Sequence, residues 1–66
     1  MSLTIDTYEK GDIYIECRWD KYVPHYQVFV GEKIDGIVYT RWEGHYDTKE
    51  SAKRSFRRQV RTVEGR

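Results

Sequence analysis

The chain of 66 residues has little of what marks several large classes of protein. Its one cysteine, Cys17, excludes an internal disulfide framework and makes a cytoplasmic location the default expectation. No apolar run approaches the roughly 18 residues that a membrane-spanning helix needs, and the N-terminus lacks the basic-then-apolar pattern of a signal peptide. A chain this short leaves little room for an enclosed catalytic pocket, so we expect neither an enzyme nor a small-molecule substrate.

Motifs for metals and cofactors are also missing. His25 and His45, taken with Cys17 or Asp47, have none of the ligand spacings that characterise zinc sites. Cys17 alternates with two isoleucines, which is typical of a small buried residue. The same alternation places His25 on the opposite sheet face from Cys17, which argues against a Cys–His nucleophile pair. We therefore expect no metal, no cofactor and no catalytic residue.

What the sequence does contain is an aromatic share of 15% and a charged share of 35%, with six tyrosines among the aromatics. Tyrosine is enriched in strands, and alternating apolar and polar residues predict an antiparallel β-meander of three or four strands. The whole chain is expected to be one α+β domain in which a single C-terminal helix packs on one sheet face. The expected strands are residues 3–8, 12–20, 25–31 and 37–43, and the expected helix is 48–63.

Turn residues separate these elements. Residues 9–12 form an expected tight turn, and residues 21–24 a connection that places Pro24 at the start of the next strand. Residues 31–36 are expected to form a hairpin loop that contains an Asp-Gly turn dipeptide. Gly44 is expected to end the last strand.

The helix has one narrow apolar stripe, made of Ala52, Phe56, Val60 and Val63, which is wide enough to cover one sheet face. Basic side chains occupy the opposite arc: Lys53, Arg54, Arg57, Arg58 and Arg61. The charge of the chain is segregated as a result. Residues 1–48 carry five Lys/Arg and nine Asp/Glu, and residues 49–66 carry seven Lys/Arg and two Asp/Glu. The basic arc is interpreted either as a solvated helix face or as a contact for an acidic partner.

A single helix covers only one face of a sheet. The expected covered face consists of Ile13, Ile15, Cys17, Tyr26, Val28, Val30, Val38 and Trp42. The expected open face consists of Tyr14, Glu16, Arg18, His25, Gln27, Phe29, Ile37, Tyr39 and Arg41. Aromatics interleaved with arginine suit stacking on nucleic-acid bases, a protein interface that includes self-association, or cross-strand pairs that only stabilise the sheet.

The stretch from Tyr39 to Phe56 resembles the end of an AP2-type or integrase arm-type DNA-binding domain. The matching residues are Gly44, Tyr46, Thr48, Glu50, Ala52 and Phe56. In that family a three-stranded sheet lies in the DNA major groove, so the resemblance implies contacts from Arg18, Gln27 and Arg41, with Tyr14 and Tyr39 beside them. The pattern is equally similar to the YegP-like small bacterial proteins, whose function is obscure. The positive charge of this chain sits on the helix, which departs from the DNA-binding pattern.

The sequence supports two functional hypotheses. The first is a small non-enzymatic binding module that uses its open sheet face and basic helix, with nucleic acid as the partner. The second is a protein-interaction or homodimerisation module, such as an accessory protein of a phage or mobile element. The candidate binding residues for either are Tyr14, Arg18, Gln27, Phe29, Tyr39, Arg41, Lys53, Arg54, Arg57, Arg58 and Arg61.

Overall fold

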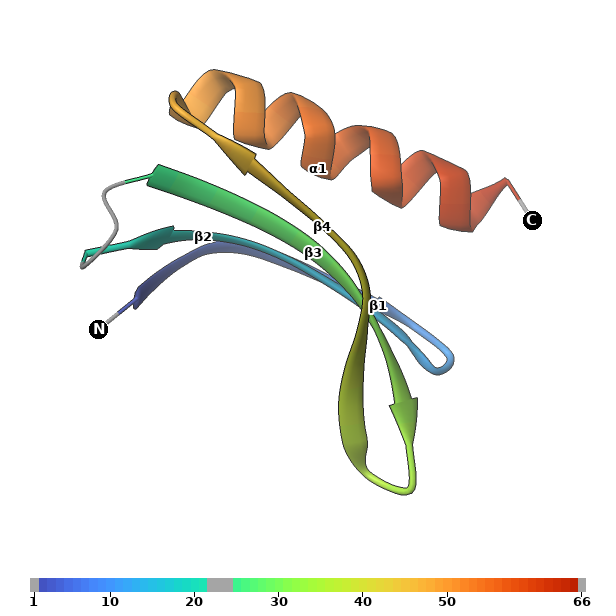
Figure 1. The fold of residues 1–66 in the computed structure, drawn as a ribbon. Helices are drawn as coiled ribbons and strands as arrows, with labels where there is room; N and C mark the ends of the chain where they lie inside the picture. Colours follow the sequence, from blue (N-terminus) through green and yellow to red (C-terminus); the bar gives the residue numbers. More distant parts are fainter. Residues whose placement is uncertain (1, 22–24, 66) are drawn as a thin grey trace.

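Four antiparallel strands and one helix make up the fold (Figure 1). The computed structural model describes residues 2–21 and 25–65. Its elements are β1 (Ser2–Lys10), β2 (Ile13–Asp20), β3 (His25–Ile34), β4 (Ile37–Tyr46) and α1 (Lys49–Glu64). The strands form one open sheet in the order β1-β2-β3-β4, and α1 packs on one face of it, mainly against β2, β3 and β4. The predicted meander with a C-terminal helix is thus confirmed.

Two expectations concern the connection before β3 and the character of the helix. The position of Pro24 at the start of a strand lies outside the described residues. Among residues 2–21 and 25–65, no helix has the length and apolar character that crossing a membrane requires.

The core lies between the helix and the middle of the sheet. Ile15, Cys17 and Val28 from the two central strands are completely buried against Ala52 and Phe56 of α1. These residues share one face because strand side chains alternate and helix side chains recur every three to four positions. The predicted covered face is confirmed in its central rows.

The helix begins and ends close to the predicted residues because its capping signals are local. The Thr48 hydroxyl accepts a hydrogen bond from the Ser51 N–H at 3.2 Å, which satisfies one of the free donors of the first turn. Gly65 follows the last helical residue. Farther along α1, buried Ser55 accepts a 2.7 Å hydrogen bond from the Tyr46 hydroxyl and so joins the helix to β4.

The hairpin between β3 and β4 is longer than predicted, and the expected loop over 31–36 is wrong. Asp35 and Gly36 both have positive φ, 53° and 81°, as a two-residue type I′ turn requires. All other residues of the expected loop belong to strands, with Ile34 paired to Ile37. The hairpin therefore projects past the end of β2 and bends away from the helix (Figure 1).

A β-bulge in β4 changes which side chains face the helix. Val30 lies opposite Trp42, but Gly31 lies opposite Thr40, so Arg41 is an extra residue in β4. One extra residue reverses the alternation for the rest of the strand. Val38, expected on the covered face, therefore lies on the open face, where its Cγ1 occupies the space that a side chain at position 31 would need.

Gly44 does not end the last strand as expected, because β4 continues to Tyr46. A Cβ atom on Gly44 would lie 2.6 Å from the Tyr46 hydroxyl and 2.9 Å from the Trp42 ring. Glycine is needed here for side-chain packing on the helix side, and the ladder to β3 passes through it unbroken.

The other edge strand also carries a bulge. The register of β1 on β2 shifts between Thr4 and Asp6, so Ile5 is the extra residue. This shift places Tyr8 in the row of Ile15, on the helix side, where Tyr8 packs against the core. Both edge strands of the open sheet thus carry a bulge.

Candidate functional site

The open face of the sheet holds an aromatic and arginine cluster, as predicted. The Arg18 guanidinium carbon lies 4.8 Å from the centre of the Phe29 ring, and the Tyr14 ring centre lies 5.9 Å from that of Phe29. Phe29 is only 9% exposed. Arginine over an aromatic ring is a favourable cation–π contact, so the cluster stabilises itself and the Phe29 face is already occupied.

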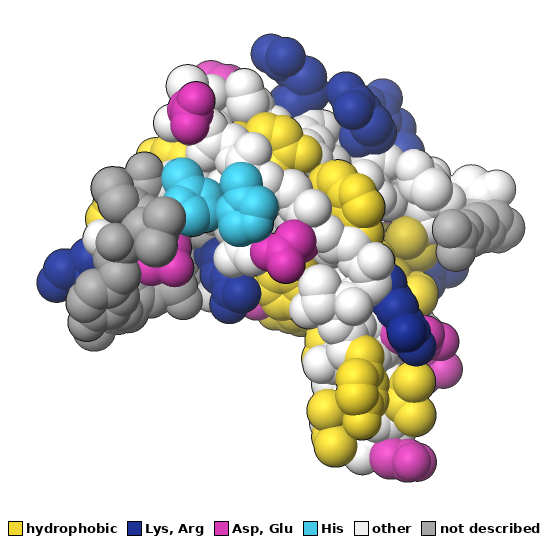
Figure 2. All heavy atoms as spheres, viewed as in Figure 1, with side chains coloured by type: hydrophobic (Ala, Val, Ile, Leu, Met, Phe, Trp, Pro, Cys, Tyr) yellow, Lys and Arg dark blue, Asp and Glu magenta, His cyan; other side chains and the backbone are white. Residues whose placement is uncertain are grey.

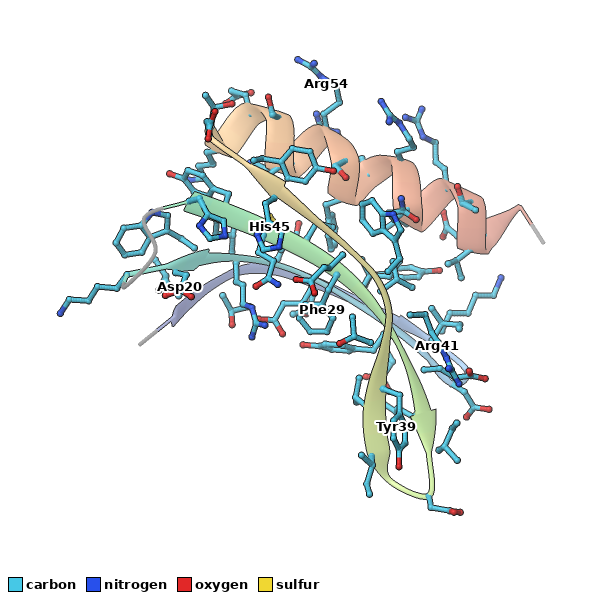
Figure 3. The ribbon with its side chains drawn as sticks, viewed as in Figure 1. Asp20, Phe29, Tyr39, Arg41, His45 and Arg54 are labelled. Carbon is cyan, nitrogen blue, oxygen red and sulfur yellow. The ribbon has the colours of Figure 1, made fainter. Side chains whose placement is uncertain are left out.

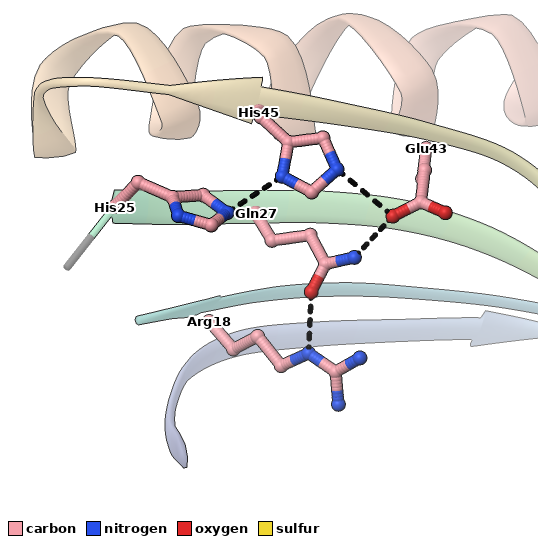
Figure 4. Close-up of polar contacts among 5 residues, drawn as sticks. All are labelled: Arg18, His25, Gln27, Glu43 and His45. Atoms are coloured by element: carbon pink, nitrogen blue, oxygen red, sulfur yellow. Dashed lines mark hydrogen bonds and ion pairs between the residues drawn. The ribbon is translucent and has the colours of Figure 1, made fainter. Parts of the chain in front are cut away.

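A chain of polar contacts crosses the same face from β2 to β4 (Figure 4). The Arg18 Nε donates to Gln27 Oε1 at 3.1 Å, and the Gln27 amide donates to Glu43 Oε2. His45 Nε2 lies 3.0 Å from the same carboxylate oxygen, and His45 Nδ1 lies 2.6 Å from His25 Nε2. Two chains of donors therefore converge on Glu43.

The direction of each hydrogen bond follows from the acceptor at the centre. A carboxylate only accepts, so the proton between His45 and Glu43 belongs to His45 Nε2. With the ring neutral, His45 Nδ1 is then an acceptor, and His25 Nε2 donates to it. The side chains in this series of polar contacts are hydrogen-bond partners of one another, so the series orders the open face of the sheet.

A second small cluster lies beside the aromatic pair. The Glu16 carboxylate accepts from the Tyr14 hydroxyl at 2.8 Å and from the Thr4 hydroxyl at 3.2 Å. Burial, followed by the hydrogen bond and negative charge of Glu16, raises the pKa of Tyr14 to about 12. Tyr14 is therefore a neutral hydrogen-bond donor at physiological pH.

Three residues predicted for the open face lie elsewhere, and Figure 3 labels two of them, Tyr39 and Arg41. Because of the bulge, Tyr39 pairs with Glu32, in the row of Ile13 on the helix side of the sheet. Arg41 forms an ion pair with Glu32, Nη2 to Oε1 at 2.8 Å. The expectation that Tyr39 and Arg41 join Tyr14, Arg18 and Phe29 is wrong. Ile37, which pairs with Ile34, shares the helix side with Tyr39.

Glu43 and His45 take their place, and neither was predicted for this face. Both pair with open-face residues of β3, Glu43 with Phe29 and His45 with Gln27. The available signal was the alternation from Glu43 to His45, which continues through Gly44. The expectation that Gly44 ends the strand excluded His45 from this alternation.

The open face is not electropositive. Four carboxylates, those of Glu9, Glu16, Asp20 and Glu43, lie in rows of this face. Glu16 and Glu43 accept hydrogen bonds within the clusters, and Arg18 contacts Phe29 and Gln27. Phosphate neutralisation supplies much of the affinity of a protein for nucleic acid, so this face has little capacity to bind nucleic acid.

The helix, in contrast, carries a row of exposed basic side chains. Arg54, Arg57, Arg58 and Arg61 are exposed and fall within about 100° of arc over residues 54–61. We call them the arginine stripe. Among the described residues, the ion pairs Lys33–Glu9 and Arg41–Glu32 and the hydrogen bond from His45 to Glu43 all lie within the sheet, and none of them involves the helix.

The figures agree with this arrangement. Figure 2 shows basic side chains gathered along α1, and Figure 3 shows Arg54 pointing away from the sheet. Lys53 belongs to a different surface, because it is partly buried and interacts electrostatically with Cys17.

An open groove of about 360 Å³ runs between β1 and the helix. Its lining residues are Thr7, Tyr8, Phe56, Arg57, Val60 and Arg61. Burial raises the pKa of Tyr8, and the negative charge and hydrogen bond of Glu64 raise it further. The groove thus has an apolar lining and two arginines that also belong to the arginine stripe.

Cys17 is buried in the core, and its surroundings do not activate it. Burial raises the pKa of the Cys17 thiol, the Asp6 carboxylate adds to the shift, and Lys53 opposes it. Among the residues that the structure describes, no group of three or more His, Cys, Asp or Glu side chains is arranged to hold a metal ion.

The last exposed feature is the projecting end of the β3–β4 hairpin. Ile34, Ile37, Val38 and Tyr39 there are between 42% and 56% exposed. Figure 2 shows hydrophobic side chains gathered on this projection. We call these four residues the hairpin tip.

Comparisons of the chain with protein-family models, with curated proteins and with solved structures found no match. The resemblance to arm-type DNA-binding domains therefore stays a prediction from the sequence pattern.

Proposed function

We propose that this chain is a non-enzymatic binding module whose helix contacts the phosphate backbone of nucleic acid. The observation that carries the proposal is the arginine stripe, in which four exposed guanidinium groups on one helix face have no ion pair within the described chain. Arginine pairs well with phosphate because its planar fork of donors matches phosphate oxygens. The contact is made by charge, so it reads little or no base sequence.

The role of the sheet in this proposal is mechanical. Its central strands and the Tyr46–Ser55 hydrogen bond hold α1 in place. Because the helix backbone is already ordered, binding adds no backbone ordering cost, and only the arginine side chains lose freedom.

Salt dependence tests the proposal directly. Fluorescence anisotropy of a labelled single-stranded oligonucleotide should show binding at 50 mM salt, with log K falling against log salt at a slope of roughly −3 for four phosphate contacts. An R54Q/R58Q double variant should lower the magnitude of that slope by about 1.4, because each lost contact removes about 0.7.

A matched control removes the same net charge from the sheet half. Lys10 and Lys21 are exposed, and a K10Q/K21Q double variant should keep the wild-type slope. Failure of the wild-type protein to bind at 50 mM salt, or an equal loss in both double variants, would contradict a specific role for the helix.

A second candidate function is self-association through the hairpin tip, which the exposure of four apolar side chains favours. The proposed occupant is a second copy of this chain. β4 is an edge strand, so two copies can pair their β4 edges about a two-fold axis. Four of the neighbouring charged residues already form the Lys33–Glu9 and Arg41–Glu32 ion pairs. Sedimentation of the protein over a range of concentrations tests this candidate.

A further inference from the structure

The groove between β1 and the helix shares two arginines with the arginine stripe. We propose that this groove holds one unpaired base of a single-stranded nucleic acid whose backbone runs along the stripe. The inference rests on the proposed function and deepens it by naming single strands as the preferred partner.

The lining of the groove suits a flat ring. Tyr8 on β1 forms one wall, and Phe56 and Val60 of α1 contribute the other apolar surface. Stacking of bases on aromatic side chains tolerates any sequence, because every base has a flat π face. A volume of about 360 Å³ is near the lower end of ligand pockets, which matches one small group rather than a large ligand.

The arginines at the rim of the groove join the proposed base site to the helix surface that is proposed to bind the phosphate backbone. Arg57 and Arg61 line the groove, and Arg54 and Arg58 continue the positive charge along the helix. A ligand with a single anionic group would use only the two arginines at the rim. A polymer with regularly repeated phosphates uses all four, which favours nucleic acid over an anionic amphiphile.

The groove also predicts discrimination against duplex. In a duplex the bases are paired and stacked, so a base must be flipped out before it can enter a pocket. A single strand carries no such cost. The arginine stripe alone binds either form, and the groove adds affinity only for the form whose bases are free.

The experiment compares a labelled single strand with the matched duplex in the full chain. Wild-type protein should bind the single strand more tightly. Y8L keeps apolar bulk but removes the aromatic face, and it should weaken single-strand binding about fivefold to a hundredfold while leaving duplex binding unchanged. Y8F keeps the ring and should behave as wild type. Circular dichroism of each variant shows whether it is folded.

A second measurement uses the wild-type protein alone. Photo-crosslinking with an oligonucleotide that contains 5-iodouracil, followed by trypsin, separates the candidate surfaces by peptide. A crosslink at Tyr8 falls in peptide 1–10, whereas one on the open face falls at Tyr14 in peptide 11–18.

The outcomes distinguish the two proposals. Crosslinking to peptide 1–10 together with a loss confined to single strands in Y8L supports the groove. Equal affinity for single strand and duplex, no effect of Y8L in a folded variant, or crosslinking only to peptide 11–18 overturns the groove and leaves the arginine stripe standing. Failure to bind either form at 50 mM salt overturns the proposed function and the groove with it.

Discussion

Tyr14 illustrates how a single residue on the open face depends on its neighbours. Its ring packs on Phe29, and its hydroxyl donates to Glu16. Burial and the Glu16 carboxylate favour the neutral hydroxyl, which is why the Tyr14 pKa rises from its ordinary value of 10.0 to about 12. The protonated Tyr14 hydroxyl thus stabilises the folded state, and as the pH rises the unfolded chain loses this proton before the folded chain does.

This difference makes a prediction about alkaline stability. The contribution of Tyr14 is complete below about pH 10 and is lost as the pH rises toward 12, because the unfolded chain then binds fewer protons than the folded one. The free energy of unfolding in urea should fall over that interval with a limiting slope of about 1.4 kcal/mol per pH unit from this group. In Y14F, measured in parallel, the fall should be shallower. Burial also raises the pKa values of Tyr8 and Cys17, so both proteins retain some alkaline sensitivity. Identical curves for the two proteins would contradict the role of the Tyr14 hydroxyl.

The helix is the element in which stability and proposed function oppose each other. Arg54 lies three residues before Arg57 and four before Arg58, and Arg57 and Arg61 are four residues apart. Like charges at these spacings destabilise a helix by roughly 0.2–0.5 kcal/mol per pair. A stripe of this kind lowers the stability of the fold, and a polyanion that neutralises it should restore that stability.

Substitutions at Arg54 separate the two effects. R54E replaces the repulsion of residue 54 with Arg57 and Arg58 by attraction in the favourable orientation, but it also replaces the attraction between Glu50 and residue 54 by repulsion. The net effect is one pair reversed in sign, so R54E should raise the free energy of unfolding by about 0.4–1 kcal/mol. R54Q, which only removes the charge, should fall between R54E and wild type. Affinity for a single-stranded oligonucleotide should follow the reverse order, with R54E the weakest. Urea denaturation and fluorescence anisotropy measure the two series. A variant that gains stability and keeps its affinity would place the binding surface elsewhere.

At the scale of the whole molecule, the exposed apolar residues concentrate at the hairpin tip, away from the arginine stripe. Leu3 and Trp42 are exceptions, since Leu3 is 64% exposed near the opposite end of the sheet and Trp42 is 39% exposed opposite Val30. Association through the hairpin tip would leave the helix free, so dimerisation and nucleic-acid binding are compatible in this fold.

Charge placed at the hairpin tip tests self-association. If two copies pair through β4, I37K should make the protein monomeric at concentrations where wild type is dimeric, because the pairing would bury an uncompensated lysine. L3K adds the same charge at the far end and should leave the dimer intact. Analytical ultracentrifugation reports both results. A wild-type protein that sediments as a monomer at millimolar concentration would remove this candidate.

The sequence by itself determined the elements of this protein, because their signals are local. Alternation in β2 and β3, the Asp35–Gly36 turn and the Thr48 cap each depend on a few neighbouring residues. The open-face set was correct for Tyr14, Arg18, Gln27 and Phe29, which come from strands that pair without a bulge.

Only the tertiary structure decided the faces of β4 and the surroundings of the helix. The bulge at Arg41 arises from the pairing of Val30 and Gly31 across the ladder, and one extra residue moved Tyr39 off the open face and Val38 onto it. No local pattern in β4 records such a shift, because its alternation looks the same in either register. The groove beside Tyr8, and the lack of an ion pair between α1 and any other described residue, likewise depend on which distant residues are packed together.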